Sequence, residues 1–103
     1  MKTYNKLVRD KIPQIIQANG QTCTTRILDN KEYIQELNKK LLEETNEFLK
    51  DQTVEELADM QEVILSILKT KNTTFEQLEE IRKQKAQKRG GFEDKIFLET
   101  TSD

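Results

Sequence analysis

The sequence contains no histidine and a single cysteine, Cys23, and these two absences exclude several kinds of chemistry. One cysteine cannot form a disulfide within the chain. With one thiol and no imidazole, the chain lacks the donors of the usual zinc sites and the base of a Ser-His or Cys-His catalytic pair. Any metal ion bound by this chain must therefore be held by oxygen.

Apolar side chains are also scarce, since 34% of the 103 residues are hydrophobic and 35% are charged. No apolar run is long enough to span a bilayer, and the first residues lead into no signal-like segment, so we expect a cytoplasmic protein without membrane contact. Burying so little apolar surface leaves one chain a thin margin of stability. We therefore expect a homodimer or a homotetramer.

Charge is segregated along the chain, although the net charge is only −2. Residues 1–31 carry six bases and two acids, residues 32–68 three bases and ten acids, and residues 69–103 eight bases and seven acids. Solvated helix faces are the usual origin of such patterns. The negative total and the lack of a clear basic recognition helix argue against nucleic acid as a partner.

Three capping patterns predict the main helices. Asp29 precedes Glu32, Thr53 precedes Glu56 and Thr74 precedes Gln77, each at the spacing of a helix start. The predicted helices run from the first cap to about Asp51, from Val54 to about Thr70, and from Phe75 to about Arg89.

The ends of the chain are less regular. Pro13 suits the first turn of a short helix that Asn19-Gly20 ends. The β-branched run over 21–28 favours an extended segment, although a single strand would have no partner. After Gly90-Gly91, the tail is predicted to pack as an arm through Phe92 and Phe97.

These elements predict an all-α fold in which an antiparallel helical hairpin and a third helix assemble into an oligomeric helix bundle. Apolar residues cover most of the circumference of the 54–70 helix, so it is expected to be largely buried. Because this apolar arc exceeds what the other helices of one chain can cover, the oligomer is expected to bury the rest. We expect residues 1–103 to form a single domain. Its parts are a basic N-terminal segment over 1–28, a helical core over 29–89 and a C-terminal arm over 90–103.

Two acidic clusters lie on the consecutive helices of the predicted hairpin. On the first helix, Glu44 falls about 20° outside the apolar stripe and Glu47 about 60° further round, whereas Glu43 points to the opposite side. On the second helix, Glu56 falls inside the apolar arc and Asp59 about 40° beyond its edge. Each inward pair is spaced i, i+3, so the four carboxylates are expected to face a shared pocket.

Partly buried carboxylates that face one another need neutralisation. Protonation, a buried lysine or arginine, or a divalent cation could supply it. The nearest bases lie at wheel angles outside the apolar faces; they are Lys39, Lys40, Lys50 and Lys69. Ions that prefer oxygen, Mg²⁺ or Mn²⁺, suit such a set of carboxylates, so the sequence favours a metal site.

The two clusters resemble the EExxE and ExxD motifs of the all-α nucleoside triphosphate pyrophosphohydrolases, the superfamily of MazG, the phosphoribosyl-ATP pyrophosphohydrolases and the dimeric dUTPases. The motifs stand here as Glu43-Glu44-Thr45-Asn46-Glu47 and Glu56-Leu57-Ala58-Asp59. The N-terminal segment 4–13 and the later Lys88-Arg89-Gly90-Gly91-Phe92 resemble a small MazG-like, or phosphoribosyl-ATP pyrophosphohydrolase-like, subgroup. Together these motifs span nearly the whole chain.

The resemblance implies Mg²⁺-dependent hydrolysis of a nucleoside triphosphate, or a related nucleotide, to the monophosphate and pyrophosphate. The metal ligands and catalytic residues that it implies are Glu44, Glu47, Glu56 and Asp59. Only eight residues separate Glu47 from Glu56, a spacing that leaves little room for insertions that recognise a substrate.

Basic residues flank the acidic clusters at both ends of the chain. Those that could neutralise the phosphates of a nucleotide substrate are Lys6, Arg9, Lys11, Lys85, Lys88 and Arg89. The main alternative is a non-catalytic oligomeric helical interaction module that uses its charged faces to bind a partner.

Overall fold

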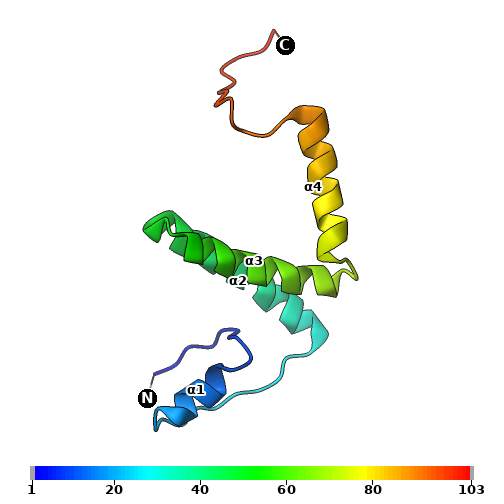
Figure 1. Ribbon diagram of the computed structural model, residues 1–103. Helices are drawn as coiled ribbons and strands as arrows, with labels where there is room; N and C mark the ends of the chain where they lie inside the picture. The colour runs from blue at the N-terminus through cyan, green and yellow to red at the C-terminus, as the bar shows by residue number, and fades with distance from the viewer. Residues whose placement is uncertain (1, 103) are drawn as a thin grey trace. The chain divides into compact units, whose positions relative to one another are not determined.

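The computed structural model describes residues 2–102 and is all-helical over that range (Figure 1). Its helices are α1 (Ile12–Ala18), α2 (Asn30–Asp51), α3 (Val54–Thr70) and α4 (Phe75–Arg89). The predicted all-α fold is thereby confirmed. The chain forms two compact units, Met1–Asn72 and Thr73–Asp103, and the boundary follows α3.

The three longer helices start at the capping residues that the sequence predicts. The backbone N–H of Glu32 donates to Asp29 at 2.8 Å, and that of Glu56 donates to Thr53 at 3.3 Å. At α4, Thr74 and Gln77 form a reciprocal capping box. Because each cap satisfies a backbone donor that the helix leaves unpaired, these residues determine where the helices start.

The short N-terminal helix also agrees with the sequence. Pro13 lies in the first turn of α1, and the chain leaves the helix through Asn19 and through Gly20, whose φ is +82°. The expected extended segment over 21–28 forms no strand. Its β-branched residues find no second strand to pair with among residues 2–102, and strand propensity alone does not make a sheet.

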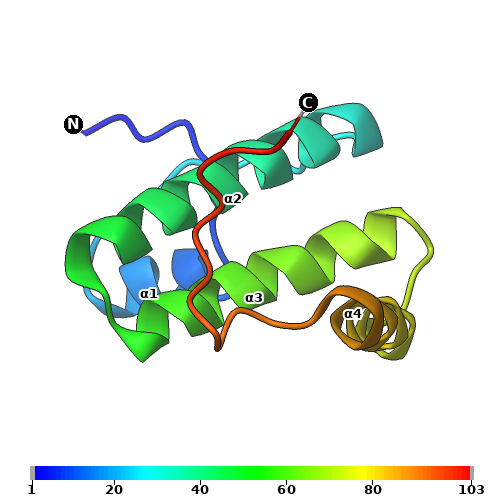
Figure 2. The same ribbon diagram turned by 90° about the horizontal axis from the view of Figure 1, so that it is seen from above.

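The first unit is organised around the α2–α3 hairpin. The two helices run antiparallel, side by side, and are joined by Gln52 and Thr53 (Figure 2). Gln52 adopts the left-handed conformation and donates its N–H to Phe48 O, which ends α2 sharply. This tight turn brings the last turn of α2 beside the first turn of α3.

The hairpin has a small core. Among the described residues, the buried hydrophobic side chains are Leu37 of α2 with Val63 and Leu68 of α3. Within the single chain α3 is only partly covered, since Val54 is 80% and Leu57 44% exposed, as the sequence predicts of an apolar arc wider than one chain can cover. The physical reason is that α3 carries apolar residues around more of its circumference than α2 can cover.

The second unit consists of α4 and the tail. No residue of α4 is buried, and Gly90 follows the helix with a φ of +82°. Phe92 and Phe97 are 97% and 86% exposed, so the packing expected of the tail is not found within the described chain. No helix within residues 2–102 is both long and apolar enough to cross a membrane.

Replacing Leu37 with alanine should lower the free energy of unfolding by about 2 to 5 kcal/mol, because Leu37 is only 3% exposed and its truncation leaves a cavity between α2 and α3. Leu37→Met, which nearly conserves volume, should cost less than about 1.5 kcal/mol. Urea unfolding followed by circular dichroism measures both. A loss below about 1 kcal/mol for Leu37→Ala would show that the hairpin core is not where the structure places it.

Candidate metal centre

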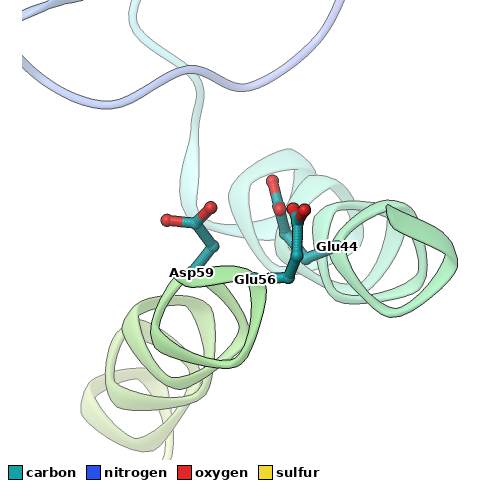
Figure 3. A group of neighbouring side chains, drawn as sticks. All are labelled: Glu44, Glu56 and Asp59. Carbon is teal, nitrogen blue, oxygen red and sulfur yellow. The ribbon is translucent and has the colours of Figure 1, made fainter. Parts of the chain in front are cut away.

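Three carboxylates from the two helices of the hairpin converge at one place. Glu44 of α2 and Glu56 and Asp59 of α3 each offer an oxygen, and these oxygens all lie within 4.8 Å of one another. Figure 3 shows the three side chains extending to the same side of the hairpin. We call these residues the carboxylate triad.

Local sequence explains why the triad forms. Thr53 caps α3 and thereby places Glu56 at the third helical position, where the Thr53 hydroxyl also donates to Glu56 Oε1 at 3.3 Å. Asp59 follows one turn later on the same face. The short turn then holds this face beside Glu44, so the geometry depends on helix starts and not on a long loop.

The triad is neither fully buried nor fully exposed. All three residues are half-buried, and the Glu44 side chain is 15% exposed. Partial burial weakens the solvation of each charge, while the open side leaves room for water or a ligand. Such a position suits a bound cation whose coordination shell is completed by water and substrate oxygens.

Glu47, the fourth acid predicted for the pocket, lies in a second group. Glu47, Asp51 and Glu56 also offer oxygens within 4.8 Å of one another, and both Glu47 and Asp51 are exposed. The structure thus brings three of the four predicted acids into one triad and places the fourth in a second group. Glu56 belongs to both groups.

Asp51 was not among the predicted site residues. It stands at i+4 from Glu47 on the last turn of α2, which the tight turn brings beside Glu56. The signal was present in the i, i+4 spacing and in the shortness of the connection.

The pKa of Glu56 is raised above its ordinary value. Desolvation is the largest cause, followed by a hydrogen bond with Asp51 and by the negative charges of Asp51 and Glu47. The Thr53 hydroxyl opposes this shift by stabilising the charged form. Ionisation of Glu56, the residue that the two acidic groups share, is therefore disfavoured. A cation bound there would stabilise the charged form.

Bases of the same chain reach the acidic residues, which corrects one sequence prediction. The wheel angle of Lys40 outside the apolar face argues against its neutralising the acids, but its Nζ lies 3.6 Å from Glu44 Oε1 and its side chain is only 17% exposed. The aliphatic part of a lysine side chain is long and flexible enough to reach a residue one turn away, so the helical-wheel angle of Lys40 does not fix where its ammonium group lies. Lys39 does turn away, pairing with Glu36 at 3.0 Å.

Two predicted phosphate-binding bases also lie beside the hairpin acids. Arg9 Nη2 donates to Asp59 Oδ1 at 2.8 Å, and Lys6 Nζ donates to Glu43 Oε1 at 3.2 Å. Both come from the irregular segment that precedes α1, for which helical periodicity predicts no direction.

Glu43 lies outside both acidic groups, as its predicted outward direction implies. Partial burial raises its pKa, but the hydrogen bond from Lys6 and the charge and hydrogen bond of Lys40 outweigh burial and lower it. Glu43 is therefore an ion-pair partner of the two lysines.

Four predicted bases remain, one at the start of α1 and three on α4. Lys11 is the N-cap residue of α1 and makes no side-chain capping bond. Lys85, Lys88 and Arg89 belong to the second unit, and Lys88 and Arg89 complement the dipole in the last turn of α4. Arg89 also lines a surface pocket of that unit, formed with residues 90–96.

Comparison of the chain with protein-family models, with curated proteins and with solved structures found no match. The metal site must therefore be judged on its own chemistry. Octahedral Mg²⁺ at about 2.0–2.1 Å from each ligand needs oxygens about 3 to 4 Å apart. The triad oxygens lie within 4.8 Å of one another, and carboxylate oxygens are the donors that Mg²⁺ prefers, so the donor set of these residues suits the ion.

Replacing Glu56 with glutamine should raise the melting temperature of the metal-free protein at pH 7. A carboxyl whose pKa is raised by folding favours the folded state while it is protonated, and this contribution is lost as the pH rises through the folded pKa. The gain from Glu56→Gln should therefore be present at neutral pH and vanish below about pH 4, where the unfolded carboxyl is also protonated.

Glu55→Gln is the matched control, because Glu55 is exposed and outside both acidic groups. Melting curves of the two variants in a chelator, from pH 4 to pH 8, compare them directly. A Glu56→Gln protein no more stable than Glu55→Gln at pH 7 would contradict the repulsion inferred at Glu56.

Proposed function

We propose that this protein is a Mg²⁺-dependent nucleoside triphosphate pyrophosphohydrolase similar to the MazG-like members of the all-α superfamily. It would hydrolyse a nucleoside triphosphate, or a related nucleotide, to the monophosphate and pyrophosphate. The observation that carries the proposal is the carboxylate triad, formed by the two motif helices at the positions that the resemblance implies. Mn²⁺ would be an alternative ion.

In this proposal, Glu44, Glu56 and Asp59 hold the metal ion. Bound there, Mg²⁺ would supply positive charge that offsets the charge developing on the phosphate oxygens during hydrolysis. The triad's partial burial strengthens this interaction, because fewer waters screen the charges than at a fully exposed site.

The Glu47–Asp51 pair would act on the attacking water. Both carboxylates are exposed and lie beside Glu56, outside the triad. Glu47 would accept a proton from a water that attacks the α-phosphorus, while the bond from that phosphorus to the bridging oxygen breaks and pyrophosphate leaves. Glu47 would thus contribute to catalysis without belonging to the triad.

Lys6 and Arg9 would contact the nucleotide phosphates. Their ammonium and guanidinium groups lie beside the hairpin acids, at 3.2 Å and 2.8 Å from Glu43 and Asp59. Guanidinium matches the fork of phosphate oxygens and lysine adds a point charge. Because nucleoside triphosphates are cytoplasmic substrates, a cytoplasmic location is part of the proposal.

Glu56→Gln and Asp59→Asn should each lower metal-dependent pyrophosphate release by about 100-fold or more, because each removes a charged donor from the triad. Circular dichroism should show an unchanged helical content. Release is measured over a panel of canonical, deoxy and damaged nucleoside triphosphates, with Mg²⁺, with Mn²⁺ and with a chelator. Glu55→Gln serves as the control and should retain activity.

Inactivity of the wild-type protein on the whole panel with either ion would contradict the hydrolase proposal. It would favour the second candidate, a non-catalytic helical interaction module. That candidate is supported by Arg9 and Lys40, which already contact two of the triad carboxylates without a metal ion. An interaction module predicts no Mg²⁺-dependent change in melting temperature.

The proposal includes assembly into a homodimer or a homotetramer. The hairpin leaves large apolar side chains exposed on both helices, with Leu42 and Leu49 each 62% exposed on α2 and Val54 80% on α3. A second copy of the hairpin could cover such side chains in a helix bundle, the arrangement predicted from the apolar arc of α3.

Sedimentation equilibrium at micromolar concentration should give two or four times the chain mass of 12.1 kDa. Replacing Leu42 and Leu49 together with serine should shift the protein toward the monomer if these side chains lie in the interface. A wild-type protein that sediments as a monomer over this concentration range would refute the assembly.

A further inference from the structure

The N-terminal segment over residues 2–11 contacts the acidic hairpin through charged groups, and we call it the N-terminal strap. Arg9 Nη2 lies 2.8 Å from Asp59 Oδ1, and Lys6 Nζ lies 3.2 Å from Glu43 Oε1. These pairs join residues 50 and 37 positions apart, within the same compact unit. The strap is therefore placed at the acidic face by tertiary contacts and not by its neighbours in sequence.

The two ion pairs differ in what they occupy. Asp59 belongs to the carboxylate triad, so the Arg9 guanidinium uses an oxygen acceptor of the candidate metal centre. Glu43 belongs to neither acidic group and is shared by Lys6 and Lys40. Arg9 thus competes with a cation at the triad, whereas Lys6 does not.

The strap is held weakly, so exchange is feasible. In the Arg9–Asp59 pair the side chains are 59% and 43% exposed, and in the Lys6–Glu43 pair they are 44% and 36% exposed. Ion pairs this exposed contribute little stability and weaken with salt. Among the apolar side chains of the strap, Tyr4 is 62% and Val8 37% exposed, and Leu7 is half-buried, so none is a fully buried anchor.

A divalent ion at the triad would attract the Asp59 carboxylate more strongly than the Arg9 guanidinium does. It carries twice the charge and would be held by three carboxylates together, whereas Arg9 makes its ion pair with only one of them. Two cations on neighbouring oxygens repel each other, so binding of the ion and the Arg9–Asp59 contact oppose one another.

We propose that Arg9 is an exchangeable internal cation of the candidate metal centre. In the metal-free protein Arg9 neutralises Asp59. When a divalent ion occupies the triad, Arg9 leaves Asp59, and the guanidinium then binds phosphate oxygens of the substrate. This inference rests on the proposed function. It adds that Arg9 neutralises Asp59 before a metal ion binds and that metal binding releases Arg9 from Asp59.

The exchange predicts effects of opposite sign for one variant. Arg9→Gln removes the competing charge, so it should bind Mn²⁺ alone about two- to fivefold more tightly than the wild-type protein, the range expected for an exposed ion pair. At saturating Mg²⁺, the same variant should bind inorganic tripolyphosphate about tenfold more weakly, because a charge-assisted phosphate contact is lost. Isothermal titration calorimetry at low ionic strength measures both affinities.

Lys31→Gln is the matched control, since it removes one positive charge from the exposed start of α2, away from the strap. It should change both affinities by less than about twofold. Arg9→Lys keeps the charge and should resemble the wild-type protein toward Mn²⁺. Trypsin cleavage after Arg9 in the wild-type protein should also accelerate when Mg²⁺ is added, because the residue leaves Asp59.

The outcomes separate this inference from the proposed function. Mn²⁺ binding that Arg9→Gln leaves unchanged or weakens, relative to Lys31→Gln, would overturn the exchange and leave the metal centre in place. Tighter Mn²⁺ binding without a loss of tripolyphosphate affinity would overturn the transfer of Arg9 to phosphate. No Mn²⁺ binding by any variant would overturn both the exchange and the metal centre.

Discussion

The α2–α3 hairpin holds three negatively charged side chains close together. Glu44, Glu56 and Asp59 hold oxygens within 4.8 Å of one another in a half-buried position, where their repulsion is screened less than in water. At Glu56 the pKa is raised by desolvation and by Asp51 and Glu47 of the second acidic group. Glu56 is thus the residue at which both acidic groups meet.

Compensation for this repulsion comes from outside the hairpin core, which is small. Leu37, Val63 and Leu68 are the buried hydrophobic side chains of the described residues, and they bring α2 and α3 together without neutralising any charge. Lys40 and Arg9 contact triad carboxylates directly. Lys40 is mostly buried and also bonds Glu43, whereas Arg9 is 59% exposed and makes its ion pair with Asp59, so Arg9 is the more readily displaced of the two.

Much of the fold could be predicted because its determinants are local. Asp29, Thr53 and Thr74 each cap a helix where the sequence places one, and the short turn after Asp51 makes α2 and α3 antiparallel. Glu44, Glu56 and Asp59 followed from helical spacing. The contact of Lys40 with Glu44 was missed because wheel angles ignore the reach of a flexible lysine side chain. Helical periodicity also does not describe the tertiary contact of Arg9 with Asp59 or the turn that brings Asp51 beside Glu56. The packing of the tail could not be predicted either, because apolar residues such as the exposed Phe92 and Phe97 do not identify the surface that they contact.

The most direct test is a crystal structure of the wild-type protein grown with Mn²⁺ and recorded at a wavelength where manganese scatters anomalously. We expect an anomalous peak at bonding distance from carboxylate oxygens of Glu44, Glu56 and Asp59, with the Arg9 guanidinium withdrawn from Asp59. A peak at some other group of acids, or an intact Arg9–Asp59 contact with no manganese at the triad, would contradict this expectation.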